Sequence, residues 1–219
     1  LFRTLWDTQT HHCEVLEARA LEYLTTPRKT TAKNKLPLWS PTEFLPSSTR
    51  LGANAVRIHW LVYDMDDGLS SFDSWRMWAQ LGYTVAAHTS YSHTPEHHKY
   101  RIALPLLEPI PASDWPRAAI AANELWAQVV GVGVPDSSAL NDRARAYYQY
   151  GISDRPHNSG IHIAGNLRLQ YGHIGVSSEV RRAPRMTKRH IADADTMLDT
   201  RVREAIAHHT GAKIQGNEV

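Results

Sequence analysis

The chain has 219 residues and contains a single cysteine, Cys13. One thiol cannot close an internal disulfide, and it cannot by itself supply the cysteines of a structural zinc site. A nearly cysteine-free chain suits a reducing compartment, so we expect a cytoplasmic protein. Its length is enough to bury a full core in one domain.

Long apolar runs are also missing. No stretch approaches the roughly 20 apolar residues that a membrane-spanning helix needs, so we expect no membrane association. The first residues, LFRTLWDTQTHHC, lack a basic end followed by an apolar core, and no secretory signal is expected. The chain does not begin with methionine, which suits a piece of a longer protein.

Charge of one sign is not in excess, because 24 Lys and Arg residues face 22 Asp and Glu residues. Binding to a polyanion would therefore have to come from local patches. Two basic tracts, residues 28–35 and 181–188, are candidates for template contacts, with solvated surface as the alternative. The motifs GxxxxGK[ST] and GxGxxG are absent, so neither a P-loop nor a dinucleotide-binding fold is predicted.

Residues 54–68, NAVRIHWLVYDMDDG, form the most informative stretch. Apolar side chains recur with the period of two that indicates a strand. The run ends in acidic residues before a glycine, and alternation places Asp64 and Asp66 on one face with Met65 on the other. Carboxylates this close repel unless a cation lies between them, and oxygen ligands suit Mg²⁺ or Mn²⁺. The alternative is a solvated turn after a core strand.

The remaining pattern predicts alternating helices and strands. Helices are expected over residues 13–24, 71–81, 113–130 (with Pro116 in the first turn) and 193–209. Strands are expected over residues 83–88, 99–106 (closed by Pro105 and Pro109), 161–165, 170–176, an apolar run leading to Asp136 and an aromatic run after it. This order predicts an α/β or α+β fold with a largely antiparallel sheet, as one domain over residues 1–219.

A polar loop and the strand after it add groups that could bind phosphate. His93 lies between Ser92 and Thr94, and Arg101 follows on the next predicted strand. Hydroxyl, imidazole and guanidinium groups that converge on one point suit a triphosphate, because they donate hydrogen bonds and offset negative charge. The alternative is an ordinary polar loop.

A third carboxylate is predicted from a separate part of the chain. Asp136 ends the apolar run VVGVGVP and would complete, with Asp64 and Asp66, the ligands for two divalent ions. Such a pair of ions catalyses phosphoryl transfer. Asp142 is the competing residue, and we prefer Asp136 because the end of a strand is a more rigid mount than a turn.

Taken together, these segments resemble the archaeo-eukaryotic primase superfamily, specifically its phage- and plasmid-encoded primase-polymerases. Members show a strand ending in DxD or DxE, a loop of the S-x-H type and a strand ending in a single Asp. Asp64 with Asp66, the loop of His93, and Asp136 are similar to these three motifs. The resemblance covers residues 38–150 and extends to WSPTEF, TRLGANAV and DSSALNDRARAYY.

The resemblance departs from the family pattern in two places: in the S-x-H loop, and around Tyr150, where the proline often found after the third motif is replaced. Tyr91 stands two residues before His93, where the family has serine, and it is flanked by Ser90 and Ser92. The hydroxyl that contacts phosphate is therefore left open between these serines. The basic nucleotide-binding residue after the third acid best matches Arg145, with Arg143 as a rival.

The resemblance implies a catalytic sheet of the RNA-recognition-motif type packed against a second α/β lobe, with the active site in the cleft between them. It implies a DNA primase or primase-polymerase of phage or plasmid replication that acts on nucleoside triphosphates and a single-stranded DNA template, with a replicative helicase as a further partner. Two Mg²⁺ or Mn²⁺ ions would be bound by Asp64, Asp66 and Asp136. The triphosphate would be bound by Ser92, His93, Arg101 and Arg145.

Two other functions remain open from the sequence. A haloacid-dehalogenase-like phosphatase also has a hydrophobic strand followed by DxD, with the first Asp as nucleophile, although here DGL follows instead of the usual residues. The other is a non-catalytic module, a primase fold that binds single strands or an origin without synthesis.

Overall fold

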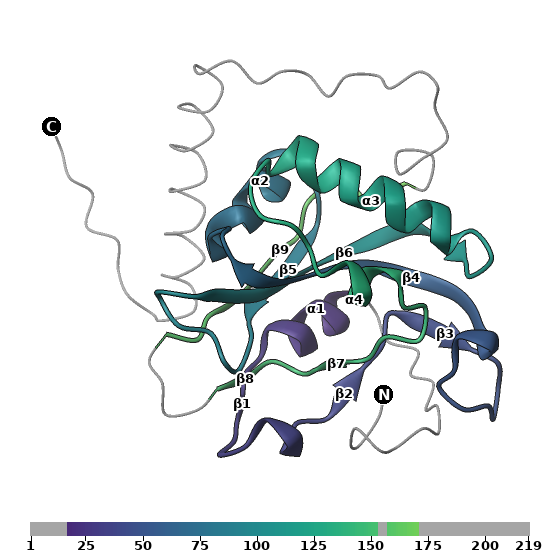
Figure 1. The fold of residues 1–219 in the computed structure, drawn as a ribbon, viewed down its shortest axis with the longest axis horizontal. Coiled ribbons are helices and arrows are strands. Elements are labelled where there is room, and N and C mark those ends of the chain that lie inside the picture. The colour runs from purple at the N-terminus through teal and green to yellow at the C-terminus, as the bar shows by residue number, and fades with distance from the viewer. Residues whose placement is uncertain (1–16, 153–156, 171–219) are drawn as a thin grey trace, which may run out of the picture. The chain divides into compact units, whose positions relative to one another are not determined.

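The computed structural model of the chain describes residues 17–152 and 157–170. Its centre is a five-stranded sheet in the order β3-β4-β6-β5-β9, in which every neighbouring pair is antiparallel (Figure 1). The strands are β3 (Thr42–Phe44), β4 (Ala55–Gly68), β5 (Val85–Thr89), β6 (His98–Pro111) and β9 (Gly160–Ile163). The predicted mixed α/β fold with a largely antiparallel sheet is confirmed.

One face of the sheet is covered by two helices, α2 (Trp75–Gln80) and α3 (Trp115–Val129), as Figure 1 shows. The side chain of Tyr63 on β4 points to this face. Its ring lies 5.5 Å from that of Trp78 and 4.9 Å from that of Trp126, and its hydroxyl donates to the carbonyl of Ala122 at 2.8 Å. These aromatic contacts fasten both helices to the central strand.

The opposite face carries α1 (Glu17–Thr25) and two small sheets. Parallel strands β1 (Arg28–Lys29) and β8 (Gly151–Ile152) form one, and antiparallel strands β2 (Leu38–Trp39) and β7 (Tyr147–Tyr148) form the other. An apolar cluster joins them to the sheet; its buried members are Leu21, Leu24, Trp39, Val62, Ala86, Ala103, Ala139 and Tyr147. Segments before β3 and after α3 are thereby packed beneath the same strands.

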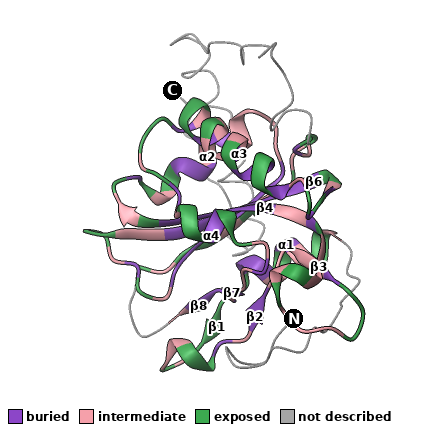
Figure 2. Cartoon of the chain, turned by 45° about the vertical axis from the view of Figure 1, so that its right-hand side comes forward, coloured by how far each residue is buried: buried purple, intermediate pink, exposed green. Residues whose placement is uncertain are grey.

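Shorter elements complete the described part of the chain. They are the 3₁₀ turns η1 (Lys33–Lys35), η2 (Gly52–Asn54) and η3 (Phe72–Ser74), and the short helix α4 (Ser137–Asn141). Figure 2 shows that buried residues gather along β4 and β6. In the residues described, no helix combines the length and apolar character needed to cross a membrane.

Most predicted elements are present. α1, η3 with α2, and α3 lie at the three predicted helices within the described residues, and Pro116 is in the first turn of α3. β5, β9 and β7 lie at the predicted strands 83–88, 161–165 and the aromatic run. The predicted strand 170–176 beyond its first residue, the basic tract 181–188 and the helix 193–209 lie outside the described residues.

The prediction that Pro105 and Pro109 close the third strand is wrong. β6 continues through both prolines to Pro111, and its pairing with β4 shifts register between Ile58 and Trp60. Proline lacks an amide hydrogen, and such a bulge tolerates it because the ladder is interrupted there.

The prediction of an apolar strand leading to Asp136 is also wrong. Residues 130–135 form no strand, and Gly131 and Gly133 have φ angles of 74° and 71°. A left-handed conformation at alternate positions breaks the pleat that a strand requires. Asp136 is instead the N-cap of α4, which follows it directly in the chain.

Candidate active site

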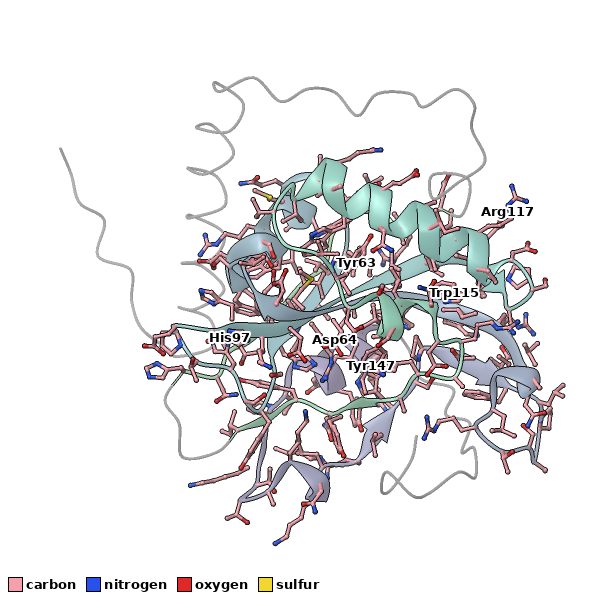
Figure 3. The ribbon with its side chains drawn as sticks, viewed as in Figure 1. Tyr63, Asp64, His97, Trp115, Arg117 and Tyr147 are labelled. Atoms are coloured by element: carbon pink, nitrogen blue, oxygen red, sulfur yellow. The ribbon has the colours of Figure 1, made fainter. Side chains whose placement is uncertain are left out.

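Asp64 lies at the middle of the sheet, on the face opposite Tyr63 (Figure 3). Its cross-strand partner on β6 is Arg101, and partners of this kind point to the same side of a sheet. The Nε atom of Arg101 is 2.9 Å from Oδ1 of Asp64, and both residues are 8% exposed. The two buried charges therefore neutralise each other.

Asp136 is brought to the same place by the backbone. Its amide donates to the carbonyl oxygen of Asp64 at 2.8 Å. The Nη2 atom of Arg145 lies 3.8 Å from Oδ2 of Asp64 and 3.6 Å from Oδ2 of Asp136. Two carboxylates that are far apart in the chain thus share one guanidinium group.

The carboxylate of Asp136 is well supplied with hydrogen bonds. Its Oδ1 accepts from the amide and the hydroxyl of Ser138, at 2.8 Å and 2.7 Å. Burial raises the pKa of this carboxyl, but the bonds from Ser138 and the charge of Arg145 outweigh burial and leave the pKa below its ordinary value. Asp136 is therefore ionised at neutral pH.

Asp66 follows on the same face. Asp64 and Asp66 both line one cavity, whereas Met65, which lies between them in the chain, is fully buried on the other side. The predicted placement of the two carboxylates on one face is therefore confirmed. The Nζ atom of Lys99 is 3.3 Å from Oδ1 of Asp66. The third acid of the run, Asp67, accepts from the amide of Val134 and so ties the end of β4 to the loop before α4.

The cavity beside these carboxylates has a volume of about 290 Å³. Its charged lining contains three carboxylates, those of Asp64, Asp66 and Asp142, and four basic side chains, those of Lys33, Arg50, Arg101 and Arg145. Such a mixture suits a ligand that carries several negative charges and binds together with cations.

Asp136 and Asp142, the two candidates for the third carboxylate, differ in what they contact. Asp142 lines the cavity, but its Oδ1 accepts from the amide of Ala144 and so holds a turn. Asp136 is not part of the cavity lining, yet it shares Arg145 with Asp64. Arg143, the rival of Arg145, donates to the carbonyl of Ala112. The shared ion pair favours Asp136 and Arg145 as the pair at the site.

The loop of His93 lies beside the cavity. Nδ1 of His93 accepts from the amide of Lys99 at 3.1 Å, so Nε2 carries the proton when the ring is neutral. Burial, and then the neighbouring His98, lower its pKa, which keeps the ring neutral at pH 7. In this loop it is the buried Ser90 that lines the cavity, whereas Ser92 is exposed and neither it nor His93 belongs to the lining.

Lys33 is a cavity residue that the sequence had suggested only as a template contact. Its pKa is lowered by burial and by Arg101, against the opposing effect of Asp64. Its Nζ lies 5.3 Å from the centre of the Tyr148 ring. The turn that carries it is anchored by the fully buried Leu36 and by the β1–β8 pairing. A basic tract after a proline resembles a solvated loop, and nothing local in the sequence reveals that pairing.

The ring of Tyr147 on β7 packs against the guanidinium groups of both Arg101 and Arg145. Its ring centre is 5.2 Å from Cζ of Arg101 and 6.0 Å from Cζ of Arg145, within the range of cation–π attraction. Burial, and then the charge of Asp64, raise the pKa of its hydroxyl well above the ordinary value. The aromatic run predicted a strand but not this role.

A neutral histidine lies next to Arg101 in the sheet. His88 on β5 pairs with Arg101 across the strands, and its ring stacks 5.2 Å from that of Tyr150. Burial and the charge of Arg101 lower the pKa of His88 to about 3. The ring therefore remains uncharged beside the guanidinium and does not compete with it for Asp64.

The fit of a metal ion to this site can be judged from its donors. In the part of the chain that the structure describes, no group of three or more His, Cys, Asp or Glu side chains is close enough to hold a metal ion. The gap between Asp64 and Asp136 is nevertheless spanned by a cation, the guanidinium of Arg145. Oxygen donors around a gap that already attracts positive charge suit Mg²⁺ or Mn²⁺. Asp64 and Asp136 are the two carboxylates at this gap, whereas Asp66, the third predicted ligand, pairs with Lys99 at 3.3 Å.

Comparison with protein-family models, curated proteins and solved structures gives no match for the chain.

Proposed function

We propose that the protein is a template-directed nucleotidyltransferase, a DNA primase or primase-polymerase of phage or plasmid replication. The observation that supports this most is the meeting of Asp64 and Asp136 at Arg145, beside a cavity with four basic side chains. Carboxylates next to concentrated positive charge are the combination that nucleotidyl transfer from a triphosphate needs.

In this proposal each residue has a stated role. Asp64, Asp66 and Asp136 would hold Mg²⁺ or Mn²⁺, which would supply Lewis-acid activation of the attacking hydroxyl and charge stabilisation of the leaving pyrophosphate. Arg101 fixes the carboxylate of Asp64, to which its Nε lies at 2.9 Å. The triphosphate is bound by Arg145, Lys33, His93 and a serine of the His93 loop, Ser90 or Ser92.

The reaction follows from this arrangement. The 3′-hydroxyl of a primer, or of an initiating nucleotide, attacks the α-phosphate of the incoming nucleotide, and pyrophosphate leaves. The central antiparallel sheet would correspond to the catalytic sheet of the RNA-recognition-motif type, and the elements on the face of Asp64 would form the second lobe. A single-stranded DNA template and a replicative helicase are the proposed partners.

The test is extension of a labelled primer on a single-stranded DNA template, with ribo- or deoxynucleotides and with Mg²⁺ or Mn²⁺. We expect incorporation that depends on both template and metal and that releases pyrophosphate. Binding to single strands without synthesis under either metal would instead indicate the non-catalytic module. Turnover of an aryl phosphate without template would indicate the phosphatase.

A further inference from the structure

The two arginines at Asp64 are held very differently. The side chain of Arg101 is 9% exposed, lies 2.9 Å from Asp64 and also donates from Nη1 to the carbonyl of Tyr148 at 3.2 Å. The side chain of Arg145 is 35% exposed, and its Nη2 lies 3.6 Å and 3.8 Å from the two carboxylates. Arg101 is a fixed part of the site, whereas the guanidinium of Arg145 is loosely held.

The backbone of Arg145 does not depend on its side chain. Its amide donates to the carbonyl of Asp142 at 3.0 Å, and its carbonyl accepts from the hydroxyl of Ser40 at 2.7 Å. The guanidinium can therefore leave the carboxylates by side-chain rotation while the loop keeps its shape. The cavity into which it can turn is already lined by Arg145 itself.

We propose that Arg145 is an exchangeable counter-ion, which occupies the gap between Asp64 and Asp136 until a divalent cation displaces it. The freed guanidinium then pairs with the phosphates of a nucleotide in the adjoining cavity. This inference rests on the metal site of the proposed function. It adds that the metal ion binds first and that its binding frees the Arg145 guanidinium to contact the nucleotide.

The physical basis is competition for the same negative charge. Two neighbouring carboxylates repel without a cation between them, and a divalent ion offsets both more completely than one shared guanidinium. Because the two contacts of Arg145 are long and partly exposed, displacing them weakens metal binding only modestly, between about twofold and thirtyfold. Removing Arg145 should recover that loss.

The experiment is calorimetric titration of the full chain with Mn²⁺, without nucleotide, supported by the electron paramagnetic resonance signal of free Mn²⁺. Four proteins are compared: wild type, Arg145→Gln, Arg145→Lys and Arg143→Gln. Arg143 is the matched control because it lies in the same loop, carries the same charge and donates to the carbonyl of Ala112 instead of a carboxylate. We expect Arg145→Gln to bind Mn²⁺ between about twofold and thirtyfold more tightly than wild type, and the other two to stay within about twofold.

A second readout follows the freed guanidinium. Binding of a non-hydrolysable nucleoside triphosphate is measured in wild type and Arg145→Gln, with and without Mn²⁺. The substitution should weaken nucleotide binding when Mn²⁺ is present and have little effect when it is absent. An equal loss under both conditions would overturn the exchange, because Arg145 would then reach the nucleotide without being released.

The outcomes separate this inference from the proposed function. If wild type binds Mn²⁺, Asp136→Asn abolishes binding and Arg145→Gln leaves it unchanged or weaker, the exchange is overturned and the metal site stands. If neither wild type nor Arg145→Gln binds Mn²⁺, the metal site of the proposed function is rejected and the exchange with it.

Discussion

The amide of Asp136 donates a hydrogen bond of 2.8 Å to the carbonyl oxygen of Asp64. This single backbone contact joins the C-terminal half of β4 to the start of α4 and sets the two carboxylates on either side of Arg145. A side chain at a helix N-cap is held by its own helix, so the second carboxylate is as firmly placed as the first. Five predictions follow from the neighbourhood of this contact.

Replacing Asp136 by Asn should lower nucleotide incorporation while leaving the stability of the fold nearly unchanged. Asn caps a helix about as well as Asp, so the free energy of unfolding should change by less than about 1 kcal/mol. If Asp136 holds a metal ion as proposed, loss of its charge should lower nucleotide incorporation by roughly a hundredfold or more. Asp114→Asn removes the same charge at the N-cap of α3, where the side chain makes no capping hydrogen bond, and it should leave incorporation unchanged. Wild-type incorporation by Asp136→Asn, measured by primer extension, would contradict the assigned role.

Breaking the buried pair of Asp64 and Arg101 should destabilise the fold strongly. Asp64→Asn leaves the guanidinium buried and without a counter-charge, at a cost of about 3–5 kcal/mol in the free energy of unfolding by urea. The double variant with Arg101→Met should recover part of this loss. Arg57→Met removes a pair with Glu43 in which the arginine is 51% exposed, and it should cost about 1 kcal/mol or less. Equal losses for the two single variants would mean that burial of the first pair has no energetic effect.

Two lysines of one turn should behave differently. Lys33 lines the cavity, whereas Lys35 on the same 3₁₀ turn is exposed. If Lys33 contacts a phosphate as proposed, Lys33→Ala should raise the nucleotide KM by roughly tenfold or more, and Lys35→Ala should leave it unchanged. The alternative is tested by the salt dependence of template binding. If Lys33→Ala lowers that slope by about one and leaves the nucleotide KM alone, Lys33 is a template contact.

His88 should make stability depend on pH. Its pKa falls from an ordinary value of 6.5 to about 3 on folding, so the unfolded chain binds the extra proton. The resulting stability is fully present above pH 6.5 and is lost as the pH falls toward 3, by up to about 1.4 kcal/mol per pH unit. His88→Phe keeps a ring against Tyr150 and should flatten the urea-measured profile between about pH 6.5 and 4.5. A variant profile parallel to that of wild type would show that His88 has no part in it.

His93 should act on the nucleotide more than on the template. The ring is neutral, and its Nδ1 is occupied by the amide of Lys99, which leaves the Nε2 proton as the group that could reach a phosphate. His93→Ala should raise the nucleotide KM by roughly tenfold and leave the dissociation constant of a single-stranded template nearly unchanged. Equal loss of both would mean that His93 only supports the loop.

Several elements could be predicted because their signals are local. The alternation in β4 and the helical spacing of α2 and α3 appear within one segment each, so Asp64, Asp66 and Pro116 were placed correctly. The predictions were wrong where a local sequence pattern indicated one structure and the backbone conformation or strand pairing of the folded chain gave another. An apolar run that contains Gly131 and Gly133 resembles a strand, but their left-handed backbone prevents one. Pro105 resembles a strand end, but a bulge in the partner pairing accommodates it.

By itself the sequence determined that Asp64 and Asp66 share one face, because the period of two in an extended chain leaves no other arrangement. Through its single cysteine it also excluded a disulfide within these 219 residues. Only the tertiary structure decided that Asp136, Arg145 and Lys33 meet at that face, because β1 pairs with β8 and α4 packs beside β4 across long separations in the chain. Such contacts depend on how whole elements pack, and no short window of residues contains that information.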